Sequence, residues 1–144
     1  MYAVKDILNE KGHECWTIDP DSTVYDALKK MAGKNIGALL VVQGDDVLGI
    51  FSERDYARKI VLKGKSSKDT KVGEMMSDRI YTVTPTSTTG ECMQLMTDHR
   101  VRHLPVLDEG KLIGIVSIGD IVNKIIQDQG QTIQQLGDYI SGKR

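Results

Sequence analysis

Several features that would indicate a common class of protein are scarce or missing in this chain. Only two cysteines occur among 144 residues, Cys15 and Cys92, which is too few for a disulfide framework and favours a reducing, cytoplasmic setting. No apolar run approaches membrane-spanning length, and charges interrupt the first fifteen residues where a signal peptide would need its apolar core. The net charge of −1 argues against a broad basic surface for nucleic acid or anionic membrane.

Motifs for catalysis are also missing. The chain has no Walker lysine motif, no dinucleotide glycine fingerprint and no evident set of nucleophile, base and orienting residue. We therefore predict that the protein is not an enzyme and carries no cofactor.

Metal binding has weak candidates. His99 and His103 have the spacing of metal ligands on one helix, but Pro105 indicates that they lie on different elements. His13 and Cys15 have no further cysteine or clustered carboxylate nearby, and a surface loop is the simpler interpretation. We predict no metal site.

What the chain does have is an internal repeat. Residues 16–60 align with residues 81–125 at a constant shift of 65, without a gap, and thirteen of the 45 positions are identical. Ordinary composition would give roughly three identities by chance. The chain is therefore an internal duplication, and two like units packed together are expected to form two like clefts.

Each copy predicts the order strand, helix, strand, strand, helix. In the first copy we expect a strand at 16–18, and then a helix that is capped by Ser22 and ends at Gly33 and Asn35. A hairpin of two strands, Ala38–Val42 and Val47–Phe51, follows. Ser52 caps the last helix, whose expected inner face is Tyr56, Ala57, Ile60 and Val61. In the second copy we expect a strand at Ile80–Val83, and then a helix that is capped by Ser87, with Cys92, Met93 and Met96 on its inner face. The hairpin consists of His103–Leu107 and Lys111–Val116, with Pro105 near the start of its first strand. The expected inner face of the last helix is Ile118, Ile121, Val122 and Ile125.

This pattern predicts an α+β fold of two βαββα repeats related by a pseudo-two-fold axis. The expected domains are a first repeat at 1–62, a linker at 63–71, a second repeat at 72–126 and a C-terminal helix at 127–144. A short amphipathic piece precedes each copy, at Val4–Leu8 and at Val72–Met76. In the terminal helix one face carries Ile133, Leu136 and Ile140, which suggests packing or self-association.

The most informative motif is a glycine-led strand that runs into Ser-x-x-Asp. It occurs as Ser52 with Asp55 and again as Ser117 with Asp120. One interpretation is a capping box, worth about 1 kcal/mol. The other is that the carboxylate accepts both hydroxyls of a ribose, with the serine hydroxyl and the first helical N–H groups as further polar partners. The two interpretations are compatible, because serine can cap while aspartate binds.

The duplication, this motif and the Arg102-His103-Leu104-Pro105-Val106 run together resemble the CBS-domain family over nearly the whole chain. The resemblance implies a stand-alone CBS pair, or Bateman module, that binds AMP, ADP, ATP, NAD or S-adenosylmethionine. By position, Asp55 and Asp120 would hold the ribose. The strands before them would hold the adenine, through Ile18, Ile36 and Ala38 in one site and Val83, Val101 and His103 in the other. The full set of expected ligand-binding residues is Ile18, Asp19, Ile36, Gly37, Ala38, Ser52, Arg54, Asp55, Arg58, Val83, Thr84, Val101, Arg102, His103, Ser117 and Asp120.

The two expected clefts differ on the side of the ligand's phosphates. The second copy gathers basic residues just before and at the start of its hairpin, namely His99, Arg100, Arg102 and His103. The first copy has less charge at those positions, where Lys34 is the basic residue, but it places Arg54 and Arg58 on its last helix. We therefore expect two unequal sites.

The resemblance also implies a homodimer that senses adenine nucleotides and signals to an unidentified protein partner. The alternative is an oligomerisation or scaffold module without ligand-driven regulation. A ligand-dependent rise in melting temperature would separate the two.

Overall fold

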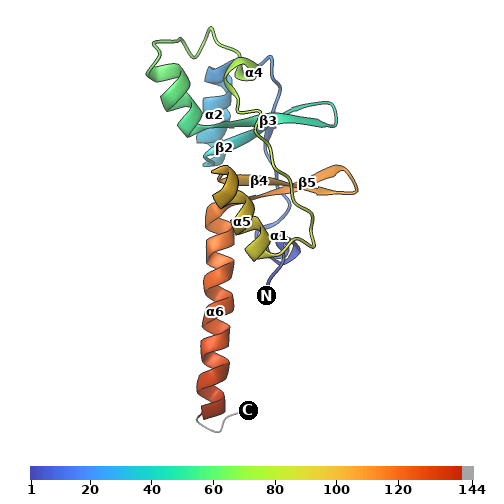
Figure 1. Cartoon of the computed structure of the whole chain (residues 1–144). Helices are drawn as coiled ribbons and strands as arrows, with labels where there is room; N and C mark the ends of the chain where they lie inside the picture. The colour runs from blue at the N-terminus through green and yellow to red at the C-terminus, as the bar shows by residue number, and fades with distance from the viewer. Residues whose placement is uncertain (141–144) are drawn as a thin grey trace. The chain divides into compact units, whose positions relative to one another are not determined.

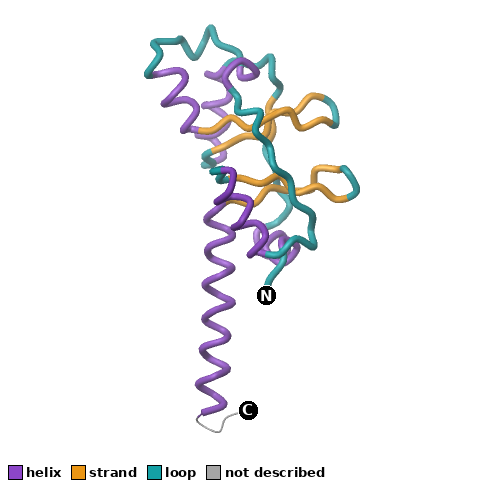
Figure 2. Tube along the Cα trace, in the orientation of Figure 1, coloured by secondary structure: helices purple, strands orange, loops and turns teal. Residues whose placement is uncertain are grey.

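The computed structural model describes the backbone of residues 1–140 and the side chains of residues 1–130. Helices and strands are mixed, which confirms the predicted α+β fold (Figures 1 and 2). The chain forms two compact units. The first-repeat unit is Glu14–Ile80, and the second-repeat unit is Met1–His13 together with the chain from Tyr81 onward. Within the described residues, no helix is both long and apolar enough to cross a bilayer.

The first-repeat unit holds a three-stranded sheet. β1 (Thr17–Ile18) pairs in parallel with β2 (Ala38–Gln43), which forms the predicted antiparallel hairpin with β3 (Asp46–Ser52). α2 (Val24–Lys34) connects β1 to β2 and ends at Asn35, whose φ of 54° is left-handed, as expected for a C-cap. The apolar sides of these elements form one core, made of Ile18, Val24, Ala27, Met31, Leu39, Val41, Phe51, Ile60 and Val72.

The second-repeat unit has the same hairpin, β4 (His103–Asp108) with β5 (Lys111–Ser117), but lacks its parallel neighbour. The predicted strand at Ile80–Val83 is wrong, since only a single bridge between Val83 and Val106 forms. Proline explains the difference. In the first repeat the Leu40 N–H donates to the Trp16 carbonyl at 3.3 Å, and the equivalent of Leu40 is Pro105, which has no N–H.

The predicted caps of two helices are wrong by one residue. Thr23, and not Ser22, caps α2, because its hydroxyl accepts the Asp26 N–H at 3.1 Å. In the same way Thr88 caps α5 (Thr89–His99) through the Glu91 N–H. Ser87 instead closes the preceding turn, where its hydroxyl accepts the Thr84 N–H. Threonine and serine have the same capping chemistry, so the sequence could not separate adjacent candidates.

The helix after Ser52 also departs from expectation. It consists of one turn of α3 (Glu53–Asp55) followed by the π-helix η1 (Tyr56–Val61). Ile60 is buried as predicted, but Ala57 is exposed and Val61 is 54% exposed. A π-helix has more residues per turn than an α-helix, and so it rotates these positions away from the core.

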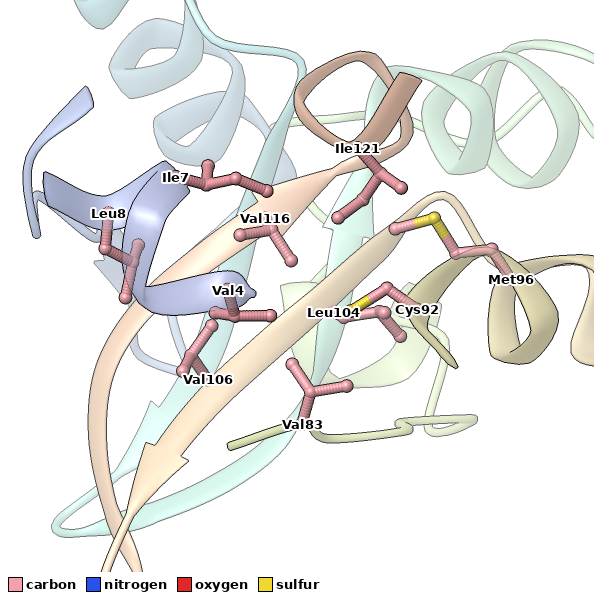
Figure 3. Close-up of a cluster of buried hydrophobic side chains, with 10 residues drawn as sticks. All are labelled: Val4, Ile7, Leu8, Val83, Cys92, Met96, Leu104, Val106, Val116 and Ile121. Atoms are coloured by element: carbon pink, nitrogen blue, oxygen red, sulfur yellow. The ribbon is translucent and has the colours of Figure 1, made fainter. Parts of the chain in front are cut away.

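The short pieces that precede the repeats are exchanged between them. α1 (Val4–Lys11) belongs to the second-repeat unit, where its Val4 N–H donates to the Ser87 carbonyl. α4 (Val72–Met75) belongs to the first-repeat unit, and the next residues pair with β3 through Ser77 and Ile50. α1 precedes the first repeat in sequence but packs on the hairpin of the second, as its side chains show in Figure 3. α4 precedes the second repeat but packs with the first.

α6 (Ile118–Ile140) follows β5 directly. Its predicted inner face is right for Ile121, which is fully buried, and for Ile125, which packs against the core. It is wrong for Ile118 and Val122, which are 40% and 38% exposed. The predicted face of Ile133, Leu136 and Ile140 lies outside the residues whose side chains are described.

Candidate functional site

In the first repeat, Ser52 and Asp55 form a closed hydrogen-bonded pair at the start of α3. The Asp55 Oδ2 accepts from the Ser52 N–H and hydroxyl, both at 3.0 Å, and the Ser52 Oγ accepts from the Asp55 N–H at 3.2 Å. The predicted capping box is therefore present. It holds the carboxylate in a defined position at the end of β3.

The second repeat copies this arrangement at the start of α6. The Asp120 Oδ2 accepts from the Ser117 N–H at 2.9 Å, and the Ser117 Oγ accepts from the Asp120 N–H at 3.1 Å. No described residue donates a hydrogen bond to the other oxygen, Oδ1, of Asp120. The Asp120 side chain is 26% exposed and so is partly in contact with solvent.

The first helical N–H groups are less available than expected. The Glu53 N–H donates to the Gly37 carbonyl at 3.0 Å, and the Ile118 N–H donates to the Arg102 carbonyl at 2.9 Å. These bonds tie the residue before each hairpin to the start of the helix that follows it. They bring Gly37 and Arg102, both predicted site residues, beside the Ser-x-x-Asp turns.

The first residue of each hairpin joins the same group. Ala38 lies opposite Ser52 in the β2–β3 ladder, and His103 lies opposite Ser117 in the β4–β5 ladder. His103 is largely buried, and this burial lowers its pKa even though the nearby Asp120 carboxylate opposes the shift. The start of the β4–β5 hairpin therefore presents an uncharged imidazole at neutral pH.

Other predicted site residues lie farther along the same hairpins or in the turns. Ile18 and Val83 are buried beside the middle of the hairpin strands, opposite Val41 and Val106. Asp19 and Thr84 bond within their own turns, the Asp19 Oδ1 accepting from the Asp21 N–H and the Thr84 N–H donating to Ser87. The remaining members are partly buried apolar residues before the hairpins or exposed arginines: Ile36, Val101, Arg54 and Arg58.

Two members of the expected basic cluster of the second repeat have local structural roles. His99 stacks on Tyr81 with ring centroids 3.8 Å apart, and Arg100 is the left-handed C-cap of α5. The first repeat has the equivalent contact, because Lys34 Nζ lies 4.1 Å from the ring centroid of Trp16. His99 and His103 lie on different elements, as predicted. Among the described residues, no three His, Cys, Asp or Glu side chains are placed to share a metal ion.

Two lysines that sequence reasoning missed contact the paired aspartates. In the first repeat Lys59 comes from η1, with its Nζ 3.3 Å from the Asp55 Oδ1. In the second repeat Lys11 comes from α1, and its Nζ donates to the Asp120 Oδ2 at 2.8 Å. The identity of Lys59 with its repeat equivalent Lys124 was a visible signal. Lys11 gave none, because its partner is 109 residues away.

Lys124 forms its ion pair with Glu10 and not with Asp120. Its side chain is only 4% exposed, and it forms an ion pair with Glu10, donates to Gln127 and lies over the Tyr2 ring. Glu10 and Lys11, adjacent on α1, thus bind Lys124 and Asp120, which are one turn apart on α6. Burial alone would raise the pKa of Asp120, but the hydrogen bonds from Lys11 and Ser117 and the charge of Lys11 lower it overall.

Comparison with known proteins gives a consistent result. The model of the CBS domain matches this chain twice, at residues 4–62 and 72–127. The mitochondrial CBS domain-containing protein CBSX3 of Arabidopsis thaliana is 43% identical over 149 residues, which cover 97% of this chain and 72% of the relative.

Solved structures with CBS domains also resemble this fold. A proposed signal-transduction protein with CBS domains from Burkholderia ambifaria has a TM-score of 0.84 and 56% identity, covering 89% of this chain and 96% of that one. A hexameric CBS-CP12 protein from bloom-forming cyanobacteria has a TM-score of 0.77 and 25% identity, covering 98% of this chain and 88% of that one. Since the domain model matches both repeats and each repeat carries the same hairpin with its serine and aspartate, the chain belongs to the CBS-domain family.

Proposed function

We propose that this protein is a regulatory module that senses adenine nucleotides and is not itself an enzyme. Each repeat binds an adenosine-containing ligand, AMP, ADP, ATP or NAD, and Asp55 and Asp120 each accept the hydroxyls of a ribose. CBS-domain proteins are often regulatory and signal-transducing, and the Burkholderia ambifaria relative is described in those terms.

The observation that carries this proposal is the state of the Asp120 carboxylate. Ser117 and Lys11 hold one of its oxygens, and the other accepts no hydrogen bond from a described residue. The net lowering of its pKa keeps the group ionised at neutral pH. A fixed, ionised and partly exposed carboxylate is a strong acceptor for a hydroxyl, and such charge-assisted bonds contribute about 1.5–3 kcal/mol each.

The neighbouring groups suit the base and the phosphates. The partly buried hairpin starts, at Ala38 and His103, offer apolar surface and backbone polar groups for adenine. Exposed arginines supply positive charge, from Arg54 and Arg58 in the first repeat and from Arg102 in the second. Because these arginines occupy different elements, we propose that the two sites differ in affinity or in nucleotide preference.

Signalling follows from differential binding. A ligand that binds one conformation more tightly shifts the population toward it, and a protein partner then meets a changed surface. We place this module in the cytoplasm, acting without membrane or nucleic acid.

We also propose that the module forms a homodimer through α6. Ile118, Val122 and Ile126 are 40%, 38% and 59% exposed and recur every four residues along one helical face. Three exposed aliphatic side chains in a row are the kind of surface that a second copy covers. The cyanobacterial CBS-CP12 protein of similar fold is a hexamer, which supports self-association of this chain.

Thermal denaturation with AMP, ATP, NAD and guanosine monophosphate tests the sensor function. We expect an adenine compound to raise the melting temperature and Asp120→Asn to weaken binding at least tenfold, because asparagine keeps an oxygen for the Ser117 N–H but loses the charge. Asp108→Asn, at an exposed hairpin end, is the matched control and leaves the shift intact. If no adenine compound stabilises the protein, the scaffold function replaces this one.

A further inference from the structure

The second-repeat site differs from the first in receiving a side chain from the other end of the chain. Lys11 is the last residue of α1, and its Nζ donates to the Ile115 carbonyl at 2.9 Å and to the Asp120 Oδ2 at 2.8 Å. These two bonds fix the ammonium near the end of β5. It lies beside the Asp120 carboxylate in the first turn of α6, which we propose binds the ribose. Both side chains reach solvent, with exposures of 34% for Lys11 and 26% for Asp120.

The hydrogen-bonding capacity of this pair is incompletely used. A lysine ammonium has three N–H donors, and two are assigned here. The carboxylate of Asp120 has an oxygen, Oδ1, to which no described residue donates. The pair therefore presents one spare donor beside one spare acceptor. A hydroxyl group can satisfy either, since it donates one hydrogen and accepts through its lone pairs.

We propose that Lys11 is a ligand-binding residue of the second-repeat site. One hydroxyl of a cis-diol donates to the Asp120 Oδ1, and its neighbour accepts the third N–H of Lys11. This inference rests on the proposed function and adds to it the group that recognises the second hydroxyl. It also makes α1 part of the site, so that binding of the diol holds α1 against the second repeat.

The first repeat contains no such arrangement. The lysine at Asp55 is Lys59, which comes from the same helical segment, and its ammonium lies at the carboxylate oxygen that is free in the second repeat. Lys59 also donates to the Met75 carbonyl at 3.2 Å. A diol at Asp55 must therefore compete with Lys59, whereas a diol at Asp120 gains a donor from Lys11. Occupancy of the second site alone is thereby linked to the docking of α1.

A set of nucleosides separates contact with the diol from contact with a phosphate. We would measure the dissociation constants of adenosine, 2′,3′-dideoxyadenosine and AMP by titration calorimetry, in an Asp55→Asn background that silences the first site. Lys11→Met should weaken adenosine and AMP by the same factor, about tenfold, as expected for one charge-assisted hydrogen bond. It should leave dideoxyadenosine unchanged, and Lys11→Arg should bind adenosine within threefold of wild type.

Hydrogen exchange of α1 checks the link to docking. Adenosine should slow amide exchange in residues 4–11 of the Asp55→Asn protein, and not after Lys11→Met. Glu10→Gln is the matched control, because it weakens the neighbouring contact of α1 with Lys124 without touching Asp120. Glu10→Gln should speed amide hydrogen exchange of α1 in the ligand-free protein. It should lower the affinity for adenosine less than Lys11→Met does.

The remaining outcomes overturn the proposal. A loss confined to AMP would show that Lys11 binds phosphate, and a gain in affinity would show that Lys11 competes with the ligand. An equal loss from Glu10→Gln would assign the effect to α1 docking alone. If adenosine binds but Lys11→Met has no effect, this inference fails and the sensor function stands. If no adenosine compound binds the wild-type protein, both fail.

Discussion

Gly49 lies so close to Ser77 that a side chain cannot fit between them. A Cβ built on Gly49 would be 2.6 Å from the Ser77 carbonyl oxygen and 2.7 Å from the Met76 sulfur. Its repeat equivalent, Gly114, has a different neighbour, since a Cβ there would be 2.9 Å from a terminal methyl of Leu8. The same glycine thus meets backbone in one repeat and the end of a flexible side chain in the other.

This difference predicts unequal effects of one substitution. Gly49→Ala should lower the free energy of unfolding by about 3 kcal/mol, because the backbone at Ser77 or in β3 must move, and Gly114→Ala by about 1 kcal/mol, because Leu8 can rotate. Chemical denaturation of the two variants measures both values. Equal losses would mean that Met76 and Ser77 do not pack on β3 as described.

The buried lysine on α6 provides a second prediction. Glu10→Ala removes the ion-pair partner of Lys124 and leaves a buried ammonium whose other partners among the described side chains are Gln127 and the Tyr2 ring, at a cost of about 1–3 kcal/mol. Lys124→Met removes the charge but keeps the apolar stem, and should cost less. Urea denaturation of both variants tests the order, and a larger loss from Lys124→Met would contradict it.

Acid should destabilise the protein through His103. Its pKa is lowered in the folded state, mainly by burial, so the unfolded chain binds a proton more readily. Stability is therefore full above the ordinary histidine pKa of about 6.5 and falls as pH drops through it. Denaturation at pH 7.5 and 5.5 should show this loss, and His103→Gln should reduce it. An unchanged loss after His103→Gln would refute the assignment to His103.

Asp120 adds a second acid-sensitive step at lower pH. Its lowered folded-state pKa contributes stability above the ordinary aspartate value, and this stability is lost as pH falls from that value through the lower folded-state pKa. Lys11→Met removes the hydrogen bond and the charge that lower this pKa, so the loss between pH 5 and pH 3 should shrink. Lys59→Met is the control, because Lys59 does not pair with Asp120. It should leave the contribution of Asp120 to the stability lost between pH 5 and pH 3 unchanged.

The exposed face of α6 predicts a concentration-dependent dimer. Val122→Glu places a charge in the middle of the stripe formed with Ile118 and Ile126, and should convert a dimer to a monomer in sedimentation velocity runs. Gln129→Glu, an exposed position farther along the same helix, is the control with the same change in charge. A dimer that survives Val122→Glu would exclude this face as the interface.

Local signals in the sequence predicted the repeated core well. The two hairpins follow from apolar runs bounded by turn residues, and the Ser52 capping box follows from residues only three positions apart. Asn35 ends α2 as expected, because asparagine tolerates the left-handed conformation that a helix C-cap requires, and this depends on the residue itself. In each case the interactions that decide the structure lie within a few residues.

Contacts between distant residues were not predictable in the same way. The amphipathic piece at Val4–Leu8 was visible, but nothing local indicated that it would pack on the second hairpin rather than the first. The pairing of Lys11 with Asp120 depends on that placement and was missed with it. The π-helical turn at Tyr56–Val61 was likewise hidden, because no residue type marks it.

The exchange of α1 and α4 has a consequence for the order in which the protein is made. α1 leaves the ribosome before the second repeat, and Val106, Val116 and Ile121, with which it shares a core, are synthesised about a hundred residues later. During that interval the aliphatic side chains of α1 have no complete core to pack against. A nascent chain stalled near residue 100 would still expose them. Completion of the second hairpin is the event that allows α1 to dock.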